Sequence, residues 1–230
     1  MKKGDMKKQE IIRTAEIRFC RDGYEKTSIQ DIIDDLHTSK GSFYHHFVSK
    51  EALLEEICRK RVQNTKEEVM LCLKKSIDAK EKMNVLINGM IPFSGERINF
   101  LLMLIPVFSG PEGEIIRNCY ANEIDNCYHE TVAETLKEGT INGLYACYDS
   151  DFFADILIMI INRFWFEICN RILENEENRK RTDPSDLMML TEYYRKAAER
   201  LLCAPYGSIS LMDFCDLKNI IEQIQLHWKL

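Results

Sequence analysis

The sequence predicts an all-α fold. Glycine and proline are scarce, with 10 and 5 among 230 residues, so the chain has few of the turn signals that sheets require. Apolar residues recur at spacings of three and four, and no window alternates apolar with polar residues for long. Because 45% of the residues are hydrophobic, the chain can bury a core. We expect one domain over residues 1–50 and a larger helical domain over 51–230.

The first expected helix runs from about Lys7 to Arg21. Its apolar stripe is formed by Ile11, Ile12, Ala15 and Phe19. Gly23 follows as a C-terminal glycine stop. A second, short helix then begins at Thr27, which has Gln30 three residues later and so fits a capping box. The apolar face of this second helix consists of Ile29, Ile32, Ile33 and Leu36.

A third short helix is expected after a tight turn at His37 and Thr38. Its apolar residues are Phe43 and Phe47, whereas residues 38–42, TSKGS, offer almost nothing to bury. Two short helices joined by such a turn are typical of a helix-turn-helix, whose second helix lies in the DNA major groove. A first turn of small polar residues can approach DNA closely, so we expect a three-helix DNA-binding domain here.

Residues 23–54, GYEKTSIQDIIDDLHTSKGSFYHHFVSKEALL, carry a family resemblance. The Gly-aromatic pair, Thr-Ser, Asp-Ile, Ser-Lys-Gly, Phe-Tyr-His-x-Phe and Ser-Lys-Glu together resemble the DNA-binding domain of TetR/AcrR transcriptional regulators. The similarity also includes residues 11–19, about a quarter of the chain in all. It implies a ligand-responsive regulator, a repressor, that binds a palindromic operator in double-stranded DNA as a homodimer.

The resemblance also implies which residues contact DNA. They are Thr27, Ser28, Thr38, Ser39, Lys40, Gly41, Ser42, Tyr44, His45 and Lys50. Thr27 and Ser28 would face a phosphate at a helix N-terminus, and Lys50 would hold another phosphate. Lys40 would donate to guanine or to a phosphate. Two alternatives stay open: Thr27 and Ser28 as helix caps only, and Tyr44 as a core residue.

The turn departs from the family pattern. Where the family has a small residue, glycine and an apolar residue, this chain has Leu36, His37 and Thr38. We therefore expect His37 either to adopt the left-handed conformation or to change the geometry of the turn.

Five further helices are expected in the body. The first begins at the cap Ser49 and runs to about Ile77, and it would connect the two domains rigidly. The others are expected over residues 96–108, over 114–138 with a stop at Gly139, over 152–173, and from Pro184 to Leu202 behind the cap Asp183. Residues 209–230 form an additional amphipathic helix that extends the dimer or covers the pocket.

The two late helices, 152–173 and 184–202, are expected to pair with their symmetry mates as a four-helix bundle. The candidate interface residues are Phe153, Ile156, Ile160, Phe164, Ile168, Leu190, Tyr194, Ala197 and Leu201. The alternative is that 152–173 is the central core helix. A small apolar or amphipathic effector of unknown identity is expected in a cavity of the body. The candidate pocket residues are Phe93, Phe100, Met103, Phe108, Tyr120, Tyr128, Phe152, Met159 and Trp165.

Charge and composition indicate which classes of function fit this chain. The net charge is -6, yet residues 1–50 hold ten Lys and Arg against eight Asp and Glu, so the N-terminal segment is mildly basic. The nine cysteines are spread singly, which is typical of buried thiols in a reducing cytoplasm. We expect no signal peptide, membrane span, metal, cofactor or enzyme motif. Two alternatives remain: a thiol-based redox regulator and a helical protein-interaction module.

Overall fold

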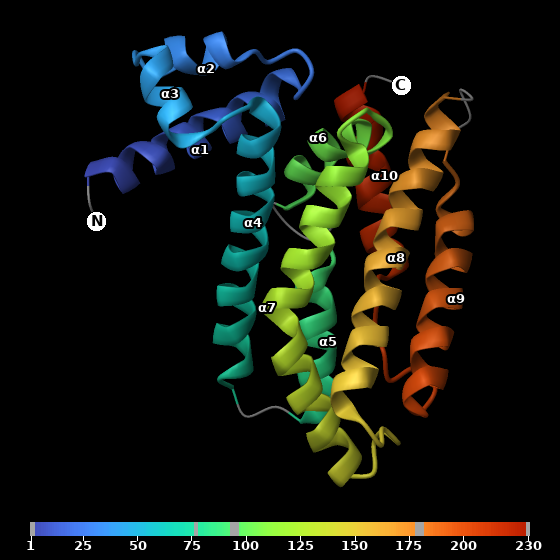
Figure 1. Cartoon of the computed structure of the whole chain (residues 1–230). Helices are drawn as coiled ribbons and strands as arrows, with labels where there is room; N and C mark the ends of the chain where they lie inside the picture. The colour runs from blue at the N-terminus through green and yellow to red at the C-terminus, as the bar shows by residue number, and fades with distance from the viewer. Residues whose placement is uncertain (1–2, 76–77, 93–96, 178–181, 229–230) are drawn as a thin grey trace. The chain divides into compact units, whose positions relative to one another are not determined.

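The computed structural model describes residues 3–75, 78–92, 97–177 and 182–228. These residues form ten helices and no strand, which confirms the predicted all-α class (Figure 1). By packing, the chain divides into two compact units, one of residues 1–61 with 99–120 and one of residues 62–98 with 121–230. The expected boundary at residue 50 divides the chain by function and not by packing, and it stays a prediction.

The first unit is built on the three N-terminal helices. These are α1 (Lys3–Asp22), α2 (Ile29–Asp35) and α3 (Lys40–His46), and α2 contacts both of the others. They bury the side chains of Ile11, Ala15, Phe19, Ile32, Phe43 and Phe47, the stripes that the sequence predicts. The first turns of α4 (Lys50–Leu73) belong to the same unit. The placement of Phe43 and Phe47 in the core is therefore confirmed.

Two further segments complete the first unit. The apolar helix α6 (Arg97–Ser109) continues through Pro106, and α7 (Gly113–Ile141) begins in this unit and continues into the second. Gly113 is required where the two helices meet, because a Cβ there would clash with the carbonyl group of Phe108. The tight α6–α7 connection thus depends on one glycine.

The second unit contains α5 (Ala79–Met90), α8 (Ser150–Glu177), α9 (Pro184–Leu202) and α10 (Phe214–Trp228), with the remainder of α4 and α7. Helices α8 and α9 are antiparallel neighbours, α10 packs on α9, and α5 packs on α8 (Figure 1). Asp183 caps α9 as predicted, since its carboxylate accepts from the Ser185 N–H at 2.8 Å with Pro184 in the first turn.

Three expected boundaries are corrected. Helix α7 passes Gly139 and ends at Ile141, because Gly139 provides room for the ring of Tyr145 and does not stop the helix. The tail is helical only from Phe214, not from Ile209, since residues before it are tied to other helices. The helix after Ser49 ends at Leu73, and Ile77 lies outside the described residues.

The cysteines differ from the expectation of uniform burial. Cys58, Cys147 and Cys169 are buried, and burial raises the pKa of each thiol. Cys72 of α4, Cys203 at the C-terminal cap of α9 and Cys215 of α10 are exposed. Within the described ranges, no helix has both the length and the apolar character that a bilayer crossing needs.

Candidate nucleic-acid interface and effector pockets

Helix α2 is capped one residue later than the sequence predicts. The Ser28 hydroxyl accepts from the Asp31 N–H at 3.2 Å, and the Asp31 carboxylate accepts from the Ser28 N–H at 2.8 Å. This is a capping box of Ser28 and Asp31, so the predicted pair of Thr27 and Gln30 is wrong. Thr27 is only 1% exposed, and its hydroxyl donates to the Gly23 carbonyl at 2.9 Å, which leaves its side chain no open surface for a phosphate.

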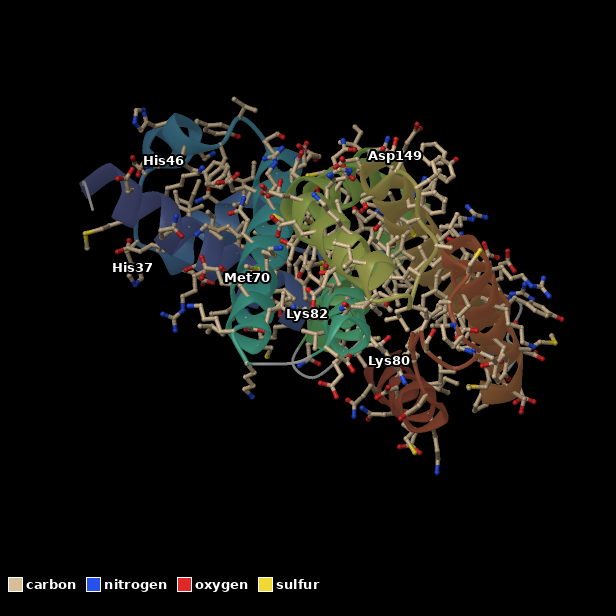
Figure 2. All side chains as sticks on the ribbon, turned by 90° about the horizontal axis from the view of Figure 1, so that it is seen from below. His37, His46, Met70, Lys80, Lys82 and Asp149 are labelled. Atoms are coloured by element: carbon tan, nitrogen blue, oxygen red, sulfur yellow. The ribbon has the colours of Figure 1, made fainter. Side chains whose placement is uncertain are left out.

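The turn between α2 and α3 is held in the left-handed conformation at His37, whose φ is 46°. The His37 N–H donates to the Asp34 carbonyl at 3.1 Å, and the Thr38 N–H donates to the Ile33 carbonyl at 3.1 Å. These hydrogen bonds end α2, and His37 occupies the left-handed position that a glycine usually takes there. The first of the two outcomes expected for His37 is confirmed, and its exposed ring, labelled in Figure 2, lies on the surface of the N-terminal domain.

Helix α3 presents its first turn to solvent. Ser39 caps the helix by accepting from the Ser42 N–H at 3.2 Å, and Ser39, Lys40 and Gly41 are exposed. A Cβ at Gly41 would meet only the Ser39 hydroxyl, at 3.8 Å, so nothing in the chain requires glycine at this position. The glycine therefore leaves the first turn of α3 open on its outer side.

The remaining predicted DNA contacts are placed as follows. Tyr44 is 52% exposed with its ring edge on Phe43, so the alternative of a core role is wrong. His45 is exposed beside His46. Lys50 is half-buried: its ammonium donates to the Tyr24 carbonyl at 3.0 Å and lies 4.0 Å from the centre of the Tyr24 ring. Lys50 therefore already ties α4 to the loop after α1.

Arg18 is a positioning residue that the sequence did not reveal. Its guanidinium donates to Asp35 at 2.5 and 2.9 Å, and it lies 3.8 Å from Asp31. The Arg18 hydrogen bond lowers the pKa of the Asp35 carboxyl, and Arg18 with Ser28 lowers that of Asp31. Helix α2 is thereby fixed on α1, and two of its carboxylates are offset by a cation.

The predicted pocket residues that the structure describes belong to both packing units. Phe93 lies outside the described residues. The aromatic and Met residues Phe100, Met103, Phe108 and Tyr120 are buried in the first unit, and Tyr128 and Trp165 are buried in the second. Met159 is 58% exposed and Phe152 is also exposed, so neither is the wall of an internal cavity. The apolar pattern marked core positions and one outward helix face.

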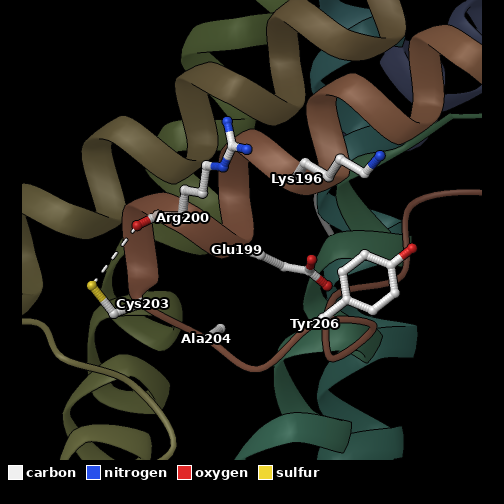
Figure 3. A pocket seen from close by; sticks show the side chains of 6 residues that line it. All are labelled: Lys196, Glu199, Arg200, Cys203, Ala204 and Tyr206. Carbon is white, nitrogen blue, oxygen red and sulfur yellow. Dashed lines mark hydrogen bonds between the residues drawn. The ribbon is translucent and has the colours of Figure 1, made fainter.

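Two pockets in the described part of the second unit have different linings. One, of about 570 Å³, lies at the end of α9 and is lined by Lys196, Glu199, Arg200, Cys203, Ala204 and Tyr206 (Figure 3). There the buried Glu199 carboxylate accepts from Arg195 at 2.6 Å, and the Arg195 guanidinium lies 4.5 Å from the centre of the exposed Tyr206 ring. The other, of about 450 Å³, lies between α4 and α5. None of the predicted pocket residues lines either pocket.

The predicted dimer residues fall into two groups. Phe153, Phe164 and Ile168 are buried within the chain, and the Phe164 ring packs on Tyr194 of α9 at 5.6 Å. Phe164 thus packs α8 against α9, and all three side chains are buried in the single chain. The others, Ile156, Ile160, Leu190, Tyr194, Ala197 and Leu201, are half-buried or exposed. The most exposed apolar side chains of the same helices are not among the predicted interface residues; they are Phe152, Met159, Met189 and Tyr193.

A capped, outward-facing second helix behind a tight turn defines the class of helix-turn-helix DNA-binding proteins. Residues 11–57 match the model of the bacterial regulatory proteins of the tetR family. The N-terminal helices of the chain are therefore similar to the DNA-binding domain of this family, and the relatives described next agree with that match.

The similar proteins are regulators. YerO of Bacillus subtilis (strain 168), an HTH-type transcriptional regulator, is 29% identical over 143 residues, which are 58% of this chain and 48% of YerO. The repressor KstR2 of Mycolicibacterium smegmatis is 38% identical over 53 residues, 23% of this chain and 26% of that protein. The chain thus matches about half the length of one relative and a quarter of the other.

Solved structures share the fold. A regulator from Saccharomonospora viridis in complex with choline aligns with a TM-score of 0.55 and 23% identity, over 85% of this chain and 96% of that one. A TetR-family regulator from Mesorhizobium loti aligns with a TM-score of 0.56 and 18% identity, over 87% of this chain and 98% of the other. At this identity the similarity shows the fold alone.

Proposed function

We propose that this protein is a homodimeric, effector-responsive repressor that binds a palindromic operator through α3. The observation that carries the proposal is the first turn of α3. Lys40 and Gly41 are exposed there, no contact within the chain requires the glycine, and Phe43 and Phe47 anchor the helix from behind. A turn of this kind lets the backbone approach base edges closely.

The proposed contacts follow from exposure. Thr38, Ser39, Lys40, Gly41 and Ser42 enter the major groove, with Lys40 donating to guanine. Tyr44 and His45 contact base edges or the sugar-phosphate backbone. Ser28 and Lys50 contact phosphates, and Lys50 does so with the amine hydrogens that Tyr24 does not use. Thr27 is left out of the side-chain contacts because it is buried.

The proposed dimer uses the outward faces of α8 and α9. Phe152, Met159, Met189 and Tyr193 expose large apolar side chains on these two neighbouring helices. Large exposed apolar side chains on a pair of neighbouring helices favour an association site. A two-fold dimer would place two copies of α3 one helical turn of DNA apart, which matches a palindrome. Two similar proteins support the other parts of the proposal. KstR2 is a repressor, which supports repression here, and the Saccharomonospora viridis regulator is in complex with choline, which supports effector binding here.

The test is operator binding, and Lys40 separates the proposal from nonspecific attraction. The full chain should select a fragment from a genomic library of its host, with affinity that falls steeply as salt rises. Lys40→Ala should weaken the selected site by about 1–3 kcal/mol and random DNA much less, whereas Lys50→Ala should weaken both alike. Fluorescence anisotropy with the selected and scrambled duplexes measures both effects.

Lys218→Ala is the matched control, because Lys218 is an exposed lysine on α10 with no role in the proposed interface. Circular dichroism of Lys50→Ala checks that loss of the Tyr24 contact has not unfolded the domain. If no fragment is selected, or if Lys40→Ala behaves like Lys218→Ala, the proposal is wrong.

A further inference from the structure

The pocket between α4 and α5 has walls from three parts of the second unit. Thr65, Glu68 and Cys72 line it from α4, Asn84 and Asn88 line it from α5, and Ser210 lines it from the segment after α9. Its volume is about 450 Å³, within the range of small-molecule sites. It is distinct from the aromatic cluster that the sequence predicts as an effector cavity.

The floor of this pocket is formed where α5 approaches its neighbours closely. Gly89 and Val69 both line the pocket. A Cβ at Gly89 would clash with the Val69 side chain and would lie 2.8 Å from the Tyr128 hydroxyl of α7. The helices therefore meet beneath the pocket at a distance that only glycine allows, and the pocket ends there.

The third wall is held by one side chain. The Asn84 amide donates to the Ser208 carbonyl at 2.9 Å, and its oxygen accepts from the Ser210 N–H at 2.8 Å. The Asn84 amide thus pairs with the backbone on both sides of Ile209, as a neighbouring strand would. Ile209 is buried, and its N–H donates to Glu199 at 3.3 Å, so the segment is anchored from two helices. Asn84 is therefore the residue that positions Ser210 at the pocket.

The charge of the lining selects the occupant. Glu68 is the single charged residue in the lining, and among the described residues its carboxylate has no cationic partner within 4.0 Å. The nearby lysines point elsewhere: Lys66 donates to Thr131 at 2.7 Å, and Lys82 donates to Glu138 at 2.6 Å, both on α7. Lys80 and Lys82, labelled in Figure 2, do not line the pocket.

We propose that this pocket binds a small organic cation, an amine with a further polar group, as the effector. Glu68 at the rim pairs with the ammonium group, and the amides of Asn84 and Asn88 with the Ser210 hydroxyl hydrogen-bond the polar end. An anion is disfavoured, because the only charge in the lining is the exposed carboxylate of Glu68. The role as effector rests on the proposed regulatory function, whereas binding itself does not.

Isothermal titration calorimetry of the full chain without DNA tests the binding. Diaminobutane, butanediol and succinate share a four-carbon skeleton and differ in charge, so they isolate the electrostatic requirement. Diaminobutane should bind in a saturable way, butanediol more weakly and succinate not at all. Glu68→Gln should weaken diaminobutane binding about five-fold, the value of a partly solvated charged pair.

Glu67→Gln is the matched control, because Glu67 is an exposed neighbour that does not line the pocket. Asn84→Ala should also weaken diaminobutane binding by releasing Ser210, and circular dichroism would show an intact fold. Binding of succinate as tight as that of the diamine, no binding of the diamine, or equal effects of the two Glu variants would overturn the proposal. Binding without any change in operator affinity would leave the cation site standing and remove its effector role.

Discussion

His37 shows how one residue decides a turn. It occupies a left-handed position at which glycine pays no steric cost and most side chains pay about 1–2 kcal/mol. Histidine tolerates this region better than β-branched residues do. The hydrogen bonds to Asp34 and from Thr38 to Ile33 keep the turn closed nonetheless. The angle between α2 and α3 is therefore maintained at an energetic cost.

Substitution at His37 should separate steric cost from side-chain function. His37→Val should lower the free energy of unfolding by more than about 1 kcal/mol, because a β-branched side chain fits poorly at positive φ. His37→Gly should leave it unchanged or raise it by less than about 1 kcal/mol, since glycine also gains entropy in the unfolded chain. Urea unfolding gives both values. His45→Val, at an exposed helical position, is the control, and equal losses at both positions would show that the turn stores no strain.

The capping of α2 illustrates the element scale. A helix of seven residues gains little from its own hydrogen bonds, so its ends and its one buried face decide whether it forms. The reciprocal bonds of Ser28 and Asp31 close one end, Arg18 fixes the other through Asp35, and Ile32 and Ile33 supply the face. The cap thus determines how α2 supports the turn before α3.

The capping box predicts an acid-sensitive element. The pKa of Asp31 is lowered from 3.8, first by the Ser28 bonds and then by Arg18, so the stabilisation is present above that value. It is lost as the pH falls below 3.8 and through the lower pKa of the folded state. Ser28→Ala should cost about 1 kcal/mol at neutral pH. Asp31→Asn should flatten the decline of Tm as the pH falls below 3.8. Thermal unfolding followed by circular dichroism measures this decline.

Gln30→Ala is the control for the capping assignment, because the sequence-based capping box would have used Gln30. Its side chain bonds Asp34 at 2.7 Å on the helix surface and touches no end of α2. A loss for Gln30→Ala as large as that for Ser28→Ala would contradict the capping arrangement described here.

At the scale of the whole molecule, the α8 and α9 pair has both an inner and an outer apolar face. Phe164 and Ile168 are fully buried against the chain, whereas Met159 and Tyr193 are more than half exposed. The wide apolar stripe of residues 152–173 is therefore partly core, as the core-helix alternative predicts, and the dimer role of its outer part stays a prediction. The inner half is core, and the outer half is the surface that we assign to the dimer.

The dimer assignment predicts a monomeric variant. Tyr193→Glu would place a charge at the centre of the proposed α8–α9 interface, where burial without a partner costs several kcal/mol. Sedimentation velocity should show a dimer for the unmodified chain and a monomer for this variant. Leu71→Glu, at an equally exposed apolar position on α4, should stay dimeric. A monomeric unmodified chain, or a dimeric Tyr193→Glu, would exclude this face as the interface.

Much of the local structure of this protein could be predicted from the sequence alone, because it depends on interactions between residues close together in the chain. Most of the helices, the cap of α9 and the apolar stripe that contains Phe43 and Phe47 depend on residues within a few positions of each other, so their spacing along the chain was enough. Helix α5 was not predicted, and the sequence left two outcomes open for His37. The same signal could not separate Thr27 from Ser28, because both are good capping residues and only the packing of the loop buries the first.

Only the tertiary structure decided the features that depend on contacts between residues far apart in the sequence. Periodicity shows that a face is apolar, but not whether the chain itself, a ligand or a partner covers it. Most of the predicted pocket residues are buried, whereas Phe152 and Met159 are exposed. The Arg18–Asp35 pair and the Asn84 clamp join residues that are 17 and about 125 positions apart. No local pattern encodes such pairs, since they form only when the helices that carry them have packed.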